Sequence, residues 1–212
     1  MKIALIGATG HVGSAILAEA ARRGHSVTAI VRNPGKVSTL PGVKAVTADA
    51  ADAAALSPLL AGHDVVISAF NGGWGDPDIY NKHLDGSRAI ASAADKAGIR
   101  LIMVGGAGSL HAPDGSQFVD SPQFPEAWKA GALAARDILT ELKAKGGTGW
   151  TFVSPAMELS PGERTGTYRL GTETPVWDAE NHNRATTGDL ADAILNEAEK
   201  PQFAGKRFTL GY

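Results

Sequence analysis

The chain has 212 residues, of which 43% are hydrophobic and 20% charged, a balance typical of a globular protein with a buried core. The net charge of -2 argues against a nucleic acid or an anionic membrane surface as a partner held by charge. The chain has no cysteine, which excludes disulfides, thiolate catalysis and cysteine-bound zinc.

Short apolar runs alternate with longer alanine-rich stretches along most of the chain. We predict strands at residues 2–7, 26–32, 43–49, 64–70, 99–106, 148–155 and 206–212. We predict helices at residues 13–24, 54–62, 78–98, 125–145 and 186–200. Pro58 fits the second of these helices only if it lies in the first turn. The alternation and the apolar strands indicate an α/β protein with a Rossmann-type, doubly wound parallel sheet flanked by helices in three layers.

Two further features bear on domain organisation and location. Residues 154–185 break the alternation with prolines and glycines, so we expect a single domain over residues 1–212 with a loop-rich substrate-side region there. No apolar run approaches the roughly 18 residues of a membrane span, and no cleavage pattern follows the N-terminal apolar run. We therefore expect a cytoplasmic protein without a membrane partner, as a monomer or homodimer.

The segment LIGATGHVGSA leaves the first strand and opens the first helix. Gly7 permits a tight turn, Gly10 has no side chain to block a pyrophosphate, and Gly13 allows close packing of the helix on the sheet. The helix N-terminus offers free N–H groups and the positive end of its dipole. A tight turn without a ligand is the plainer alternative. The pattern predicts dinucleotide binding by Gly7, Ala8, Thr9, Gly10, His11, Val12 and Gly13.

The spacing GATGHVG is similar to the G-A-T-G-x-x-G signature of the extended and atypical short-chain dehydrogenase/reductase family. Further segments, GGAGSL, SPGERTGTYRLG and RFTLGY, resemble the NADH-flavin reductase subgroup of the atypical members. Biliverdin-IXβ/flavin reductase is a more distant relative in this resemblance. The resemblance covers most of the chain and implies a flavin substrate.

Arg32 ends the second strand, where an acidic side chain would bind a free ribose 2′-hydroxyl. A guanidinium there can pair with a 2′-phosphate, and Asn33 could help to hold it. We therefore expect NADP(H), with NAD(H) as the alternative cofactor and a solvated surface arginine as the plainer interpretation of Arg32.

The resemblance implies that Asp49 binds the adenine amino group and that Ala50 adds backbone contacts. A helix N-cap at Asp49 or Asp52 is the alternative. Ala69 and Phe70 end the fourth strand, and we expect them near the cofactor ribose because ligands collect at the carboxyl ends of parallel strands.

Ser109 follows the fifth strand, where the resemblance implies a group that polarises a substrate carbonyl. The usual partners, a tyrosine and a lysine spaced Y-x-x-x-K, are missing: Lys129 has Pro125 four residues before it, and Tyr80 has Leu84 four residues after it. Without this pair the protein lacks the usual proton donor. A flavin or quinone ring can accept hydride without a strong acid, so the missing pair favours an acceptor of this kind. Ser109 could instead only finish a turn.

Three other residues complete the predicted site. Pro155 follows the sixth strand and could bring backbone close to the nicotinamide, and Trp128 could stack on a flat ring or lie in the core. Arg164 could contact an anionic substrate or tie its loop down through an ion pair. The six histidines have no metal-ligand spacing, so we expect no metal site.

The sequence thus predicts an NADP(H)-dependent oxidoreductase that passes hydride to a flavin-like or quinone-like acceptor. Two alternatives stay open at this point. One is a redox sensor that binds NADP(H) without turnover, and the other is an NAD(P)-dependent epimerase or isomerase.

Overall fold

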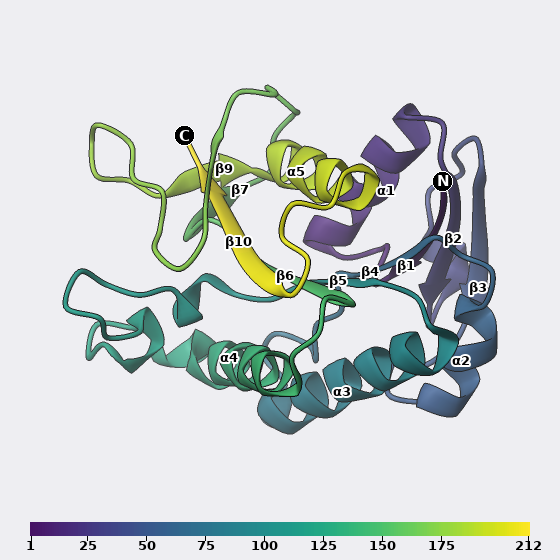
Figure 1. Cartoon of the computed structure of the whole chain (residues 1–212), viewed down its shortest axis with the longest axis horizontal. Helices are drawn as coiled ribbons and strands as arrows, with labels where there is room; N and C mark the ends of the chain where they lie inside the picture. Colours follow the sequence, from purple (N-terminus) through teal and green to yellow (C-terminus); the bar gives the residue numbers. More distant parts are fainter.

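An eight-stranded sheet lies between two layers of helices in the computed structural model, which describes all 212 residues (Figure 1). The strand order is β3-β2-β1-β4-β5-β6-β10-β8, and only β8 runs antiparallel to its neighbour. The strands of this sheet are β1 (Lys2–Ile6), β2 (Ser26–Val31), β3 (Val43–Thr47), β4 (Val65–Ser68), β5 (Leu101–Val104), β6 (Trp150–Ser154), β8 (Arg169–Gly171) and β10 (Lys206–Gly211). The chain moves outward from β1 in both directions, which opens a crevice at the carboxyl ends of β1 and β4. The predicted doubly wound α/β fold is confirmed.

The helices divide between the two faces of the sheet. In Figure 1, α1 (His11–Arg22) and α5 (Thr187–Glu199) cover one face, and α2 (Ala53–Leu60), α3 (Ile79–Ala97) and α4 (Glu126–Lys145) cover the other. Successive β1 residues enter opposite cores: Ile3 and Leu5 face α1 and α5, while Ala4 and Ile6 face the other layer. Burial on both faces explains why the strands are apolar throughout. None of the helices combines the length and apolar composition needed to cross a membrane.

One helix differs from its predicted form. Pro58 lies inside α2, not in its first turn as expected. The helix ends at Leu60, so a proline there costs a hydrogen bond only near the end of the helix. Asp52 supports the beginning of the helix, because its side chain accepts hydrogen bonds from the N–H groups of Ala54 and Ala55.

The predicted loop region contains three short strands that the sequence analysis missed. β7 (Glu158–Ser160) pairs in parallel with β9 (Arg184–Thr186), and β8 extends the main sheet beside β10. Asp189 at the start of α5 is fully buried and accepts hydrogen bonds from the N–H groups of Thr165 and Gly166 and from the Tyr212 hydroxyl. This carboxylate ties the region to the rest of the fold.

Candidate functional site

Two of the three opening glycines are required by packing. Gly7 has φ +81°, and a Cβ there would lie 2.6 Å from the Ala69 carbonyl oxygen at the end of β4. A Cβ on Gly13 would overlap the Gly7 carbonyl oxygen. The turn after β1 is therefore pressed against both β4 and the first turn of α1.

Gly10 differs from both. Its φ is -81°, which any residue adopts, and a Cβ would meet only the Gly7 oxygen, at 3.4 Å. Gly10 caps α1 without a side chain, and the N–H groups of His11, Val12 and Gly13 have no acceptor in the protein. Open space in front of free helix N–H groups is the arrangement that binds a phosphate.

A cleft of about 550 Å³ lies in front of this turn, across the carboxyl ends of β1, β2 and β4. We call it the glycine-turn cleft. Eight of the predicted cofactor residues line it: Gly7, Thr9, Gly10, Arg32, Asp49, Ala50, Ala69 and Phe70. Ala8 is buried, Val12 is half-buried and Gly13 is buried behind the turn, so these three shape the cleft without lining it.

The polar side chains at the rim of the glycine-turn cleft have different roles. Arg32 is exposed and forms no hydrogen bond or ion pair within the protein, so its guanidinium is free for a ligand. Asn33 does not line the cleft, and its side chain accepts a hydrogen bond from the Gly35 N–H at 3.1 Å, so its phosphate contact stays a prediction. Asp49 lines the cleft, whereas Asp52 is the N-cap of α2. The N-cap alternative is therefore wrong for Asp49.

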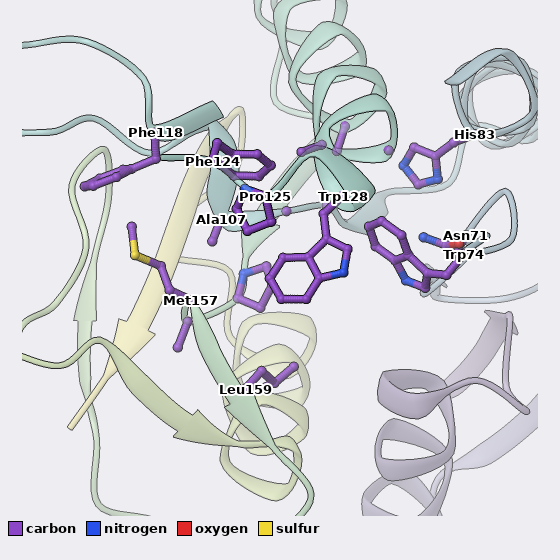
Figure 2. Close-up of a pocket in the computed structure, with 18 of the residues that line it drawn as sticks. Asn71, Trp74, His83, Ala107, Phe118, Phe124, Pro125, Trp128, Met157 and Leu159 are labelled. Atoms are coloured by element: carbon purple, nitrogen blue, oxygen red, sulfur yellow. The ribbon is translucent and has the colours of Figure 1, made fainter. Parts of the chain in front are cut away.

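A second cavity, of about 660 Å³, adjoins the cleft and is lined by 21 residues, none of them Asp, Glu, Lys or Arg. We call it the aromatic cavity (Figure 2). Trp74 and Trp128 lie at its opening with 61% and 58% of their surfaces exposed. Asn71 lines both the cleft and the cavity, so the two lie next to each other. Others of its lining residues are His11, His83, Phe118, Phe124, Pro155, Met157 and Leu159.

The aromatic cavity brings together residues that the sequence analysis treated in different ways. The predicted residues Trp128 and Pro155 line it, and His11 lies on its wall instead of in the cleft. Trp128 is not in the core. Trp74, His83, Phe118 and Phe124 were missed, because nothing in their spacing shows that they converge. Their substrate contacts, like those of Trp128, are predictions that the geometry permits.

His83 on α3 lines the aromatic cavity and packs against Phe70, which lines the glycine-turn cleft. His83 is 5% exposed, and its ring stacks on Phe70 with ring planes 8° apart and centroids 5.9 Å apart. The Gly72 N–H lies 3.3 Å from Nδ1 and donates to it, which places the ring proton on Nε2. Burial lowers the pKa of His83 to about 4, so the ring is neutral near pH 7.

Ser109 does not have the role predicted for it. Its side chain is 2% exposed, lines neither the cleft nor the cavity, and accepts a hydrogen bond from the Arg207 guanidinium at 3.0 Å. The turn η2 (Ala107–Ser109) leaves it inside the fold, where its backbone and side-chain oxygens accept hydrogen bonds from the buried Arg207 of β10. The prediction that Ser109 polarises a substrate carbonyl is therefore wrong. Arg207 also pairs with Glu173; burial acts to raise the pKa of Glu173, but Lys143 and Arg207 hold it below its ordinary value.

Arg164 also has a structural role. Its guanidinium pairs with Asp192 on α5 and lies 3.8 Å from Glu19 on α1, outside both the cleft and the cavity. The Tyr168 hydroxyl donates to the same Asp192 at 2.7 Å. The prediction of a substrate contact is wrong for Arg164, and the alternative, an ion pair that ties the loop down, is confirmed.

All three tyrosines are bonded away from the cleft and the cavity. The hydroxyls of Tyr80, Tyr168 and Tyr212 donate to Asp137, Asp192 and Asp189 respectively, at 2.7 to 2.8 Å. Burial raises the pKa of Tyr212, and the hydrogen bond to Asp137 raises that of Tyr80. No tyrosine lines the cleft or the aromatic cavity.

A family model described as NAD(P)H-binding matches residues 7–201. The chain belongs to this NAD(P)H-binding family. The open space at Gly10 and the free N–H groups of α1 fit the nicotinamide dinucleotide that the family description names. The match does not distinguish NADP(H) from NAD(H).

Solved structures extend the similarity over the full length. A candidate exported protein from Burkholderia pseudomallei is 42% identical with a TM-score of 0.86, and the match covers 100% of both chains. A candidate epimerase from Bacteroides thetaiotaomicron is 39% identical with a TM-score of 0.91, covering 100% of this chain and 96% of the other. A candidate NADH-flavin reductase from Streptococcus pneumoniae is 34% identical with a TM-score of 0.84, covering 100% and 99%.

These relatives confirm the predicted resemblance to Rossmann NAD(P)-binding proteins that include a candidate NADH-flavin reductase. Two of their names denote different reactions and the third denotes none, so the similarity establishes the fold and the family but no single acceptor. One relative is named as exported, and the cytoplasmic location of this protein stays a prediction.

Proposed function

We propose that this protein is an NADP(H)-dependent reductase that passes hydride to a flat conjugated acceptor of the flavin or quinone type. The observation that carries this proposal is the aromatic cavity, which has no Asp, Glu, Lys or Arg in its lining and adjoins the glycine-turn cleft at Asn71. An apolar cavity of this kind suits a planar ring.

The glycine-turn cleft fits a dinucleotide. The pyrophosphate would lie over Gly10 against the free N–H groups of α1. Arg32 favours NADP(H), because a free guanidinium at the end of β2 can pair with a 2′-phosphate. A bound nicotinamide supplies the hydride, and the residues at the ends of β4 and β6 determine where its ring can lie.

The protein's own contribution is positioning rather than proton transfer. Trp128 can stack on the acceptor, and the apolar residues Met157 and Leu159 close the opposite side of the cavity (Figure 2). A conjugated acceptor takes up hydride without a strong acid, since solvent can supply the proton. The three tyrosines, all bonded elsewhere, support this acceptor class over a tyrosine-dependent epimerase of the kind suggested by the name of the Bacteroides relative.

The test is NADPH consumption, followed by absorbance, with the purified protein and a panel of flavins and quinones. We expect turnover with at least one of them and a preference for NADPH over NADH. Tight NADPH binding with no turnover of any acceptor would contradict the reductase and favour an NADP(H)-binding redox sensor. Turnover of a nucleotide sugar without net NADPH consumption would favour the epimerase.

A further inference from the structure

The aromatic cavity has a single buried polar side chain, that of His83. The other polar side chains that line it are exposed or half-buried: His11, Asn71, Ser121 and Gln123. We propose that the acceptor is an uncharged conjugated ring with a carbonyl oxygen, and that His83 Nε2–H donates a hydrogen bond to that oxygen. This inference rests on the proposed function and specifies the substrate class and the residue that orients it.

The first argument is charge. None of the lining residues of the aromatic cavity is cationic, so a phosphate or carboxylate inside it would lose water without gaining an ion pair. An uncharged quinone, or the ring of riboflavin, loses no such hydration. The phosphate of FMN and the carboxylates of a bilin would find no cationic side chain among the residues that line this cavity.

The second argument is the unused hydrogen-bond donor. Because Nδ1 accepts from Gly72, the proton of the neutral ring lies on Nε2, which has no acceptor in the protein. The residue is 5% exposed, and burial keeps its pKa near 4, so it remains a neutral donor. No acceptor in the protein takes this proton, so the N–H is available to a ligand carbonyl that enters the cavity.

The third argument is fixed orientation. Phe70 stacks on one face of the imidazole, and α3 approaches so closely that a Cβ on Gly72 would lie 2.7 Å from the backbone nitrogen of His83. Phe70 lines the glycine-turn cleft and His83 lines the aromatic cavity. The imidazole is therefore fixed near Asn71 and Trp74, on the side of the aromatic cavity that adjoins the glycine-turn cleft (Figure 2).

Two substitutions separate ligand contact from a purely structural role. The amide of glutamine can place an N–H donor near the position of Nε2, whereas asparagine can place an acceptor near Nδ1 to pair with Gly72 but cannot reach the ligand. We expect His83→Asn to lower kcat/KM for an uncharged naphthoquinone about tenfold, mainly through KM, and His83→Gln to recover most of that loss. NADPH affinity should stay within about twofold in both.

The reverse pattern, with His83→Asn active and His83→Gln impaired, would overturn the proposed contact and leave His83 as a packing residue. If both variants fail to fold, the wild-type enzyme still tests the substrate class. We expect riboflavin to have kcat/KM at least equal to that of FMN, and the uncharged naphthoquinone to exceed its sulfonated analogue about tenfold. A preference for the charged member of both pairs would overturn the inference.

Failure of the proposed reductase activity can be distinguished from failure of the His83 contact. If no acceptor is reduced, binding of the uncharged naphthoquinone to the NADP⁺ complex can still be measured by quenching of tryptophan fluorescence from the cavity. Binding that His83→Asn weakens about tenfold supports the site without the reaction. Quenching that is equal in wild type and His83→Asn refutes the contact.

Discussion

Gly10 and Gly13 lie one turn apart but should respond in opposite ways to an added methyl group. Gly10→Ala should leave the melting temperature near that of wild type, because the Cβ meets no close atom, and should weaken NADPH binding about tenfold or more by blocking the pyrophosphate. Gly13→Ala, the matched control, should lose about 1–3 kcal/mol of stability through overpacking against Gly7. Thermal melts and NADPH titration measure both, and unchanged affinity in Gly10→Ala would contradict the phosphate assignment.

Arg32 carries the proposed choice of cofactor. Arg32→Ala should lower the affinity for NADPH about tenfold while changing that for NADH little, because only NADPH has the phosphate that a guanidinium would bind. Lys36→Ala, in the exposed turn η1 (Pro34–Lys36), is the control for a general loss of positive charge. If the ratio of the two affinities is the same in wild type and Arg32→Ala, the assignment is wrong.

His83 predicts a pH dependence of folding. Its pKa falls from 6.5 to about 4 on burial, so below pH 6.5 the unfolded chain binds the proton more readily than the folded protein does. His83 should therefore cost about 2 kcal/mol of stability between pH 7 and pH 5, a loss that His83→Gln should lack. Denaturant unfolding at both pH values measures the difference between the two proteins. Parallel pH profiles would show that the imidazole titrates normally.

Among the elements, the segment before α5 depends most on a single side chain. Burial acts to raise the pKa of Asp189, but hydrogen bonds from Gly166, Tyr212 and Thr165 hold it below its ordinary value of 3.8. The carboxylate therefore stabilises the fold above about pH 4, and this contribution is lost as the pH falls through the lowered pKa.

Asp189→Asn should lose about 2–3 kcal/mol of stability at neutral pH, because an amide can replace only part of these acceptor contacts. It should also increase proteolytic cleavage within residues 161–170, which Asp189 holds in place. Asp85→Asn, on the exposed face of α3, is the control. Equal stability and equal cleavage in Asp189→Asn and wild type would contradict this role.

The existence and type of the long elements could be predicted, whereas the short ones could not. α3 and α4 repeat apolar residues over five turns, which leaves a clear helical period in the sequence. β7, β8 and β9 have three residues each, too few for any period, and their pairing depends on chain segments far away. The predicted strand ends at Arg32, Asp49, Phe70 and Pro155 lie beyond the paired residues, where the chain leaves the sheet and lines the cleft or the cavity.

The cleft and the cavity adjoin at Asn71, so we expect the two ligands to influence each other. A dinucleotide in the glycine-turn cleft would complete the wall of the aromatic cavity near Asn71. We expect an uncharged naphthoquinone to bind at least about fivefold more tightly to the NADP⁺ complex than to the free protein, with the reciprocal effect on NADP⁺. Fluorescence titration in both orders measures the coupling, and equal affinity with and without NADP⁺ would show that the two sites are independent.

The glycine spacing, the strand–helix alternation and Arg32 are local features, and from them the sequence alone indicated the fold, the dinucleotide turn and the expected cofactor preference. The roles of Ser109, Arg164 and His83 depended on tertiary structure. The first two are determined by a hydrogen-bond or ion-pair partner that is distant in the chain, and the third by the cavity that it lines. Ser109 meets Arg207, Arg164 meets Asp192, and His83 joins a cavity built from α3, α4 and the segment after β6. The sequence determines which chemical groups are present, but their burial and the availability of a free hydrogen-bonding atom arise only when distant segments pack together.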